Sequence, residues 1–256
     1  MSPILSTSEL SRHFGGVAAL NLVSVAIEDK QVRSIIGPNG AGKTTLINAI
    51  TGRLPVTSGT VTYLGQDITS WPIHDRVKRG LCRTFQITSV FKGLTAFENV
   101  RIARQAHKGG SLRLFASRGS LKQVTEDTWA ILERVGLTDK ALAPCSSLAH
   151  GDQRVLEVAI ALAGGPRVLM LDEPAAGMSP TETDQVAKLI SDLGREMAVV
   201  LVEHDMEMVM SISDRITVLH QGGIIAEGTP AEISDNEQVK DAYLGSEKWA
   251  PLVALD

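Results

Sequence analysis

The residues best suited to do chemistry form a short glycine-rich run early in the chain. Residues 37–44 read Gly-Pro-Asn-Gly-Ala-Gly-Lys-Thr, which fits a glycine, four residues and then Gly-Lys-Ser/Thr. The glycines let backbone N–H groups approach phosphate oxygens without a Cβ in the way. A helix beginning near Lys43 adds the positive end of its dipole. The run therefore predicts a nucleotide-phosphate site.

The side chains of this run have separate expected roles. The Lys43 ammonium is expected at the β- and γ-phosphates, the Thr44 hydroxyl at a Mg²⁺ ion, and Thr45 at the α- and β-phosphates. The other loop positions expected to contact ATP are Asn39, Gly40, Ala41 and Gly42. A β-branched stretch at 32–36 precedes the loop and apolar residues at helical spacing follow it. Strand, loop and helix thus come in the required order.

Two later apolar runs end in polar residues. Residues 168–171 lead directly into Asp172 and Glu173, and residues 198–202 are followed two positions later by His204. Such runs are typical of buried parallel strands, whose carboxyl ends lie at one edge of a sheet. Asp172 is expected to hold Mg²⁺ through water, and Glu173 to polarise the water that attacks the γ-phosphate. A neutral His204 can donate to that phosphate.

Phe14 and Gln86 are candidates of a different kind. Phe14 lies at a turn between two strands expected within residues 4–27, where its ring could stack on adenine or pack in the core. Gln86 follows a strand expected at 81–85, which would present it to the γ-phosphate side and to Mg²⁺. Phe14 would add a contact to the adenine ring, and Gln86 would add a third contact to Mg²⁺ after those of Thr44 and Asp172.

Composition narrows the class of protein. A chain of 256 residues that is 43% apolar can bury a full core as one large domain, or as a domain with a lobe. A net charge of −4 gives no electrostatic footprint for nucleic acid, so no nucleic-acid partner is expected. No apolar run or signal-peptide start points to a membrane span, which favours the cytoplasm. Cys82 and Cys145 have no metal-ligand or disulfide spacing.

Taken together, these motifs resemble an ATP-binding-cassette ATPase from about residue 4 to 245. The resemblance implies an α/β fold: a P-loop (RecA-like) ATPase core with an N-terminal antiparallel β subdomain and an inserted helical subdomain. It implies one domain over 1–256, with the core and β subdomain at about 1–86 and 165–228, the helical subdomain at about 87–164 and a helical tail at about 229–256. ATP and Mg²⁺ are the implied ligands, and ATP hydrolysis is the implied reaction. The implied catalytic residues are Lys43, Gln86, Glu173 and His204.

The signature segment of that family departs from its usual sequence. The family has Leu-Ser-Gly-Gly-Gln, whereas this chain has Leu148, Ala149, His150, Gly151 and Asp152. In the family this segment completes the ATP site of another subunit, and the usual serine hydroxyl is missing here. The later loop usually ends in Asp, and this chain has Ser179. These departures imply a heterodimer with a related second ATPase rather than a homodimer.

Finer features are similar to the branched-chain amino-acid importer ATPases, most of all to the longer of their two ATPase subunits. They are Arg-Thr-Phe-Gln at 83–86, the segment 93–100, a glycine-rich insertion at about 105–122 and the ending at 242–245. The resemblance implies permease subunits that meet Gln86 at the cytoplasmic face of the membrane, and indirectly a periplasmic or extracellular binding protein. Urea and lipopolysaccharide-export ATPases share much of this pattern. A soluble cassette ATPase acting on nucleic acid, ribosomes or iron–sulfur assembly is the alternative from another class.

Overall fold

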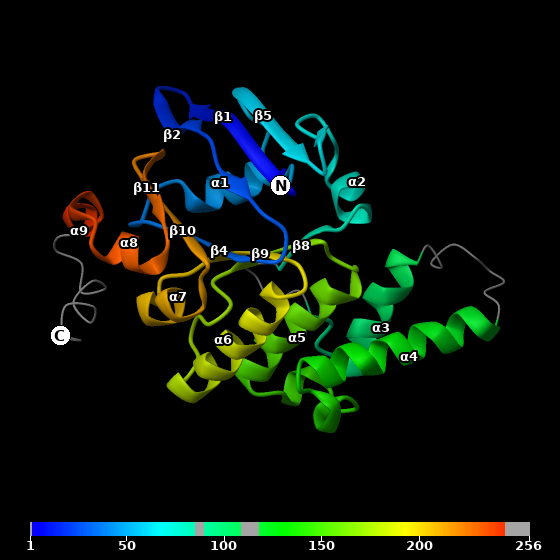
Figure 1. Cartoon of the computed structure of the whole chain (residues 1–256). Coiled ribbons are helices and arrows are strands. Elements are labelled where there is room, and N and C mark those ends of the chain that lie inside the picture. The colour runs from blue at the N-terminus through cyan, green and yellow to red at the C-terminus, as the bar shows by residue number, and fades with distance from the viewer. Residues whose placement is uncertain (1, 85–89, 109–117, 244–256) are drawn as a thin grey trace.

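The computed structural model describes residues 2–84, 90–108 and 118–243, and arranges them as two sheets with helices between and beneath them (Figure 1). The N-terminal sheet is antiparallel, with strand order β2-β1-β5-β6 and β3 paired to β1. Its strands are β1 (Leu5–Phe14), β2 (Val17–Val23), β3 (Ala26–Ile27), β5 (Ser58–Tyr63) and β6 (Gln66–Asp67). The two strands expected within residues 4–27 are confirmed, and β3 is an addition.

The larger sheet has strand order β11-β10-β4-β9-β8-β7, and all its neighbouring strands are parallel except β10 and β11. Its strands are β4 (Val32–Ile36), β7 (Leu81–Arg83), β8 (Val168–Asp172), β9 (Ala198–Val202), β10 (Arg215–His220) and β11 (Gly223–Gly228). Parallel pairing puts the carboxyl ends of β4, β9 and β8 at one edge, where ligands of open α/β sheets bind. The predicted α/β fold with an N-terminal antiparallel sheet is therefore confirmed.

The helices cover both faces of the larger sheet, with α1 between the two sheets and α5 and α6 on the opposite side (Figure 1). The α-helices are α1 (Lys43–Ile50), α2 (Ile73–Lys78), α3 (Ala96–His107), α4 (Arg118–Arg134), α5 (His150–Ala163), α6 (Pro180–Gly194), α7 (Met206–Ile212), α8 (Pro230–Ser234) and α9 (Glu237–Tyr243). Two short 3₁₀ helices, Thr138–Lys140 and Cys145–Ser147, precede α5. Within the described ranges, no helix is both long and apolar enough to cross a membrane.

The central strands β8 and β9 are apolar at every position except Asp172, because both of their faces are buried. In β8, Val168 and Met170 face the core that contains α1, whereas Leu169 and Leu171 face the core that contains α5 and α6. Strand β9 divides its five residues between the same two cores. This two-sided burial explains why the sequence shows continuous apolar runs rather than alternation.

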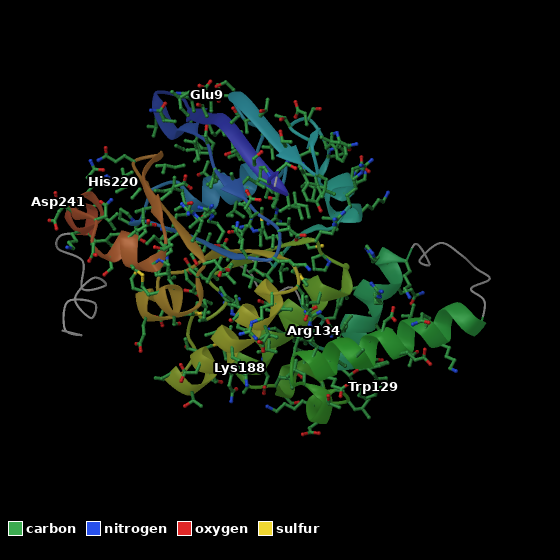
Figure 2. The ribbon with its side chains drawn as sticks, in the orientation of Figure 1. Glu9, Trp129, Arg134, Lys188, His220 and Asp241 are labelled. Carbon is green, nitrogen blue, oxygen red and sulfur yellow. The ribbon has the colours of Figure 1, made fainter. Side chains whose placement is uncertain are left out.

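Helices α3 and α4 pack on each other and on α5. The rings of Phe97 on α3 and Trp129 on α4 have centroids 5.0 Å apart, and Figure 2 shows Trp129 at the outer edge of this group. Asp127 on α4 forms ion pairs with Lys108 Nζ at 2.7 Å and with Arg104 Nε at 2.8 Å. These donors, with Lys108 first, hold the pKa of Asp127 well below its usual range. The group is thus tied by both ring packing and charge.

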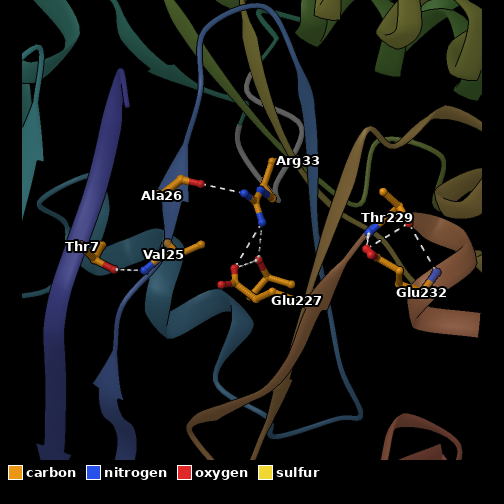
Figure 3. Close-up of polar contacts among 8 residues, drawn as sticks. Thr7, Val25, Ala26, Arg33, Glu227, Thr229 and Glu232 are labelled. Atoms are coloured by element: carbon orange, nitrogen blue, oxygen red, sulfur yellow. Dashed lines mark hydrogen bonds and ion pairs between the residues drawn. The ribbon is translucent and has the colours of Figure 1, made fainter. Parts of the chain in front are cut away.

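Strand β4, which leads into the glycine-rich run, is held by a buried arginine. Arg33 donates to the carbonyl oxygen of Ala26 at 2.7 Å, and to Thr217 Oγ1 and Glu227 Oε1 at 3.2 Å each (Figure 3). Burial lowers the pKa of Arg33, and the charge of Glu227 opposes that shift. The contacts join β4 to β3, β10 and β11, so the strand before the loop is fixed on two sides.

The carboxyl end of α1 is capped by a second buried arginine, Arg76. Its guanidinium donates to the carbonyl oxygens of Ile50 at 2.5 Å and Ala49 at 3.3 Å, where a helix leaves its last carbonyls without partners. It also donates to the carbonyl oxygens of Thr69 at 2.8 Å and Trp71 at 3.0 Å. Only 2% of Arg76 is exposed, and burial lowers its pKa. This side chain therefore fixes α1, and through it the loop at the other end of the helix.

We expect Arg76→Met to lower the free energy of unfolding by about 3 kcal/mol, because four backbone carbonyls lose a charged donor in a buried place. Chemical denaturation measures this loss. Lys78→Ala is the control, since Lys78 is exposed two positions away on the same helix; its effect should stay within about 0.5 kcal/mol. A loss below about 1 kcal/mol for Arg76→Met would mean that water replaces the guanidinium.

Candidate functional site

The strand ends bring the predicted site residues to one edge of the larger sheet. In the register of the sheet, Ile35 on β4 and Asp172 on β8 are both paired with Val202 on β9. The glycine-rich loop begins two residues after Ile35, Glu173 follows Asp172, and His204 lies two residues beyond Val202. Residues predicted from three separate stretches of sequence are thus neighbours at this edge.

The backbone of residues 37–44 passes very close to neighbouring main chain. A Cβ at Gly37 would clash with the carbonyl oxygen of Leu219, and a Cβ at Gly42 would come within 2.6 Å of the carbonyl oxygen of Ala19. Gly42 also has φ 105°, in the left-handed region that favours glycine. Gly40 faces open space instead. Two of the glycines are therefore required by packing, and the third leaves the loop open to a ligand.

Lys43 lies across this loop as the first residue of α1. Its Nζ donates to the carbonyl oxygens of Gly37 at 2.6 Å and Pro38 at 3.1 Å, and only 6% of the residue is exposed. Thr44 is exposed and Thr45 is half-buried. The first-turn N–H groups of α1 have no intrahelical partner, and with the lysine they form a group of positive donors suited to phosphate. Asn39 and Gly40 are exposed beside it, whereas Ala41 is buried.

Asp172 is buried at 4% exposure and uses only one of its oxygens within the described chain. Oδ2 forms an ion pair with Arg83 at 2.7 Å, and Arg83 also donates to Asn48 Oδ1 on α1 at 2.5 Å. Oδ1 is buried and accepts no hydrogen bond from the described residues. An oriented carboxylate with an unused oxygen, at the sheet edge where the glycine-rich loop begins, suits Mg²⁺, which needs few protein ligands. Among the described residues, no group of three or more His, Cys, Asp or Glu side chains is arranged so that it could hold a metal ion by itself.

Glu173 and His204 form a direct pair. His204 Nε2 lies 2.9 Å from Glu173 Oε1, and the two side chains are 25% and 32% exposed respectively. Glu173 has φ 50°, which is unfavourable for a residue with a side chain, and its N–H donates to the carbonyl oxygen of Val202 at 2.8 Å. A carboxylate held in a strained backbone beside a histidine, and open to solvent, can act as a general base.

Phe14 is the last residue of β1 rather than a turn residue, and the turn begins at Gly15. It is 49% exposed, so it does not pack in the core. The guanidinium of Arg12 lies 4.6 Å from the ring centroid. One face of the ring is therefore supported by a cation, and stacking of the other face on adenine stays a prediction.

The signature segment lies at the start of α5 and contacts residues of its own chain. His150 approaches Gly177, Gly151 packs against Glu182, and Asp152 forms an ion pair with Lys140 at 2.6 Å. Ala149 is the residue before the first turn of α5 and supplies no side-chain cap, while Leu148 is buried. Ser179 caps α6 by accepting from the N–H of Glu182, as predicted. Gln86 lies outside the described residues.

A mostly apolar groove of about 200 Å³ lies between α2, β7 and α5. Its lining residues are Val77, Cys82, Arg83, Thr84, Glu157, Ile160, Ala161 and Gly164. The buried Glu157 pairs with Arg154 at 3.1 Å through one oxygen, and its other oxygen accepts no hydrogen bond from the described residues. Arg83 belongs both to this groove and to the ion pair with Asp172. Arg83 thus connects the groove to the Asp172 carboxylate.

Three residues that matter to this geometry are absent from the sequence-based prediction: Arg12, Arg83 and Glu203. Arg83 is polar within a short apolar strand, and Glu203 is an acid directly after a buried strand. A charged residue within or directly after a buried strand needs a partner, and this signal could have identified Arg83 and Glu203. Which partner it finds depends on pairing between distant segments.

The comparisons with known proteins agree with this geometry. Residues 20–176 match the family model described as ABC transporter. Residues 224–248 match the model described as branched-chain amino acid ATP-binding cassette transporter. The two matches cover the phosphate loop, the signature segment and β8 in the first case, and most of β11 with the helical tail in the second.

Individual relatives extend over nearly the whole chain. The chain is 46% identical to the high-affinity branched-chain amino acid transport ATP-binding protein BraF of Pseudomonas aeruginosa, over 95% of this chain and 98% of that protein. It is 30% identical to the lipopolysaccharide export system ATP-binding protein LptB of Haemophilus influenzae, over the same shares. The solved ADP conformation of the cassette MJ1267 superposes with a TM-score of 0.85 at 28% identity, over 96% of this chain and all of that one. The chain therefore belongs to the ABC transporter family, as an ATP-binding cassette.

Proposed function

We propose that this chain is the ATP-hydrolysing motor subunit of an importer for branched-chain or related amino acids. The observation that carries the proposal is the combination of 46% identity to BraF with an intact phosphate loop, Asp172, Glu173 and His204 at one sheet edge. Lipopolysaccharide export ranks second, because the identity to LptB is 30%. Urea or amide transport stays open, as does a soluble cassette ATPase outside transport.

The nucleotide site follows from the geometry of the loop and of α1. Backbone N–H groups of the loop and the Lys43 ammonium bind the phosphates, and the lysine exchanges its two carbonyl contacts for phosphate oxygens. The residues proposed to contact ATP are Phe14, Asn39, Gly40, Ala41, Gly42, Lys43, Thr44 and Thr45. Thr44, Asp172 and Gln86 would hold Mg²⁺, which neutralises charge on the phosphates when bound. Arg83 orients Asp172 for that role through their ion pair.

Hydrolysis is proposed to depend on Glu173 and His204. The Glu173 carboxylate accepts a proton from the attacking water, and its strained backbone aims it away from Asp172 although the two residues are adjacent. His204 holds that carboxylate at 2.9 Å and can also donate to the γ-phosphate. Lys43 and Gln86 complete the proposed catalytic set by contacting the γ-phosphate, which is cleaved from ADP.

The proposal also includes a domain organisation and a docking site for the permease, which is the groove beside β7. The helical subdomain is proposed to span about 87–164, inserted between core segments at about 1–86 and 165–228, with a tail at about 229–256. An apolar helix of a permease would fill the groove, and a donor on it would satisfy the unused oxygen of Glu157. In this proposal the chain is a peripheral subunit at the cytoplasmic face of the membrane. A binding protein on the other side would act indirectly.

The signature segment is proposed to complete the ATP site of a second ATPase subunit. Its residues are Leu148, Ala149, His150, Gly151 and Asp152, and the start of α5 offers N–H groups to a phosphate. Ala149 provides no hydroxyl, and Asp152 is held by Lys140 of its own chain. A related but different subunit with a complete signature would supply the missing contact, which favours a heterodimer.

Glu173→Gln should keep ATP–Mg²⁺ binding and lower turnover by roughly 10²-fold or more, because it removes a positioned base without changing shape. Steady-state phosphate release and calorimetric binding measure the two properties. Glu126→Gln is the control, because Glu126 is exposed on α4, away from the loop and the strand ends. Turnover near the wild-type rate in Glu173→Gln would remove Glu173 from the mechanism.

The same variant tests the assembly, because slow hydrolysis traps a closed dimer. With ATP–Mg²⁺, light scattering should find Glu173→Gln mainly monomeric alone and dimeric only with its partner ATPase. A tight homodimer, together with full-speed hydrolysis by the wild-type chain alone, would contradict the heterodimer.

Phe14→Ala should weaken ATP and GTP about equally, by about 1 kcal/mol, since stacking accepts any purine ring. Calorimetric titration with each nucleotide measures the effect. Leu142→Ala removes another exposed apolar side chain, 71% accessible on the α4–α5 connection, and should change neither affinity. Unchanged affinity in Phe14→Ala would leave the ring with no part in nucleotide binding.

A further inference from the structure

Glu203 is a buried acid at the end of β9 with no role in the mechanism above. It is 4% exposed, and none of the ion pairs among the described residues includes it. Its Oε1 accepts from the N–H of Ala175 at 2.8 Å, and its Oε2 accepts from the N–H of His204 at 2.9 Å. Burial raises the pKa of Glu203, and these N–H groups oppose that shift. The carboxylate thus bonds to backbone on two different segments.

The two segments are those that carry the hydrolytic pair. Ala175 lies two residues after Glu173, and His204 directly follows Glu203. The side chains of Glu173 and His204 meet at 2.9 Å, while the N–H of Glu173 donates to the carbonyl oxygen of Val202 at 2.8 Å. Contacts between the two segments therefore form a closed ring, with Glu203 on one side and the Glu173–His204 pair on the other.

This ring of contacts is also connected to the signature segment, through the loop after Glu173. The loop that begins at Glu173 continues through Ala175 to Gly177, which His150 approaches, and ends at the Ser179 cap of α6. Hydrogen bonds inside the loop, from Ala176 to Glu173 and from Met178 to Ala175, make it a series of tight turns. A displacement at Gly177 would therefore reach Ala175, whose N–H is held by Glu203.

Burying a carboxylate without a cation beside it costs free energy. Neutral acceptors could accept from the same two N–H groups at a lower cost in free energy. The strained φ of Glu173 also needs surroundings that fix it. Glu203 supplies two charge-assisted bonds at the place where that strain must be held. The need to place Glu173 precisely therefore explains the buried acid at Glu203 better than a contribution to the stability of the fold does.

We propose that Glu203 is a positioning residue for hydrolysis: it fixes the backbone at Ala175 and His204 so that Glu173 and His204 meet, and it links that pair to the loop beside the signature segment. This rests on the proposed ATPase function. Glu203 contacts neither nucleotide nor water in this role. It acts on turnover through the geometry of Glu173.

The test replaces Glu203 with Gln in the full chain. The amide keeps the shape but offers one acceptor oxygen, and its NH₂ group faces an N–H donor. We expect kcat for ATP to fall on the order of tenfold or more, with KM and calorimetric ATP affinity within about twofold of wild type, because the phosphate loop is not touched. Glu207→Gln is the matched control, since Glu207 is an exposed acid on α7 and should leave kcat unchanged.

A double-mutant cycle separates positioning from loss of fold. If Glu203 acts through the pair, then Glu203→Gln should slow the His204→Ala variant by less than about twofold. Three results would overturn the proposal. They are an unchanged kcat in Glu203→Gln, a rise in KM as large as the fall in kcat, and an equal slowing by Glu203→Gln in the wild-type and His204→Ala chains. Failure of the wild-type chain to bind or hydrolyse ATP would instead contradict the proposed function, so the two failures are distinct.

Discussion

The site depends on how closely the backbone of the phosphate loop approaches its neighbours. Gly37 leaves no room for a Cβ beside Leu219 at the end of β10, and Gly42 leaves none beside Ala19 on β2. The N–H of Gly222 donates to the carbonyl oxygen of Ala41 at 3.0 Å, which fixes the loop from the β10–β11 turn as well. Both sheets therefore contribute to one loop, and its N–H groups are oriented before a ligand binds.

Charge is the second constraint, because three acids lie at the carboxyl ends of two buried strands, at one edge of the sheet. Asp172 forms an ion pair with Arg83 and Glu173 lies against His204, whereas the contacts of Glu203 with the described residues are to backbone N–H groups. The differing partners distinguish three chemically similar groups, which we propose act as a metal ligand, a base and a positioning group. Arg83 also lines the groove beside β7, so a partner bound there would contact the side chain that orients Asp172.

Local pattern predicted much of this arrangement. The loop at 37–44 is recognisable because its function requires fixed residue types at fixed spacing, and Asp172 and Glu173 because they end a run that must be buried on both faces. The cap at Ser179 was predictable for the same reason. The partners of Arg76, Arg83 and Glu203 were not, because each depends on which distant strand or helix lies alongside. Phe14 was placed one position too far, since strand β1 extends to the turn itself.

The central claim is that this sheet edge binds ATP–Mg²⁺ through the loop and Lys43. Calorimetric titration of ATP with Mg²⁺ into the wild-type chain, Lys43→Ala and Lys78→Ala tests it most directly. The account predicts saturable binding to one site in the wild-type chain and in Lys78→Ala, tighter with Mg²⁺ than without, and loss of binding in Lys43→Ala. Equal ATP affinity in all three chains would contradict it.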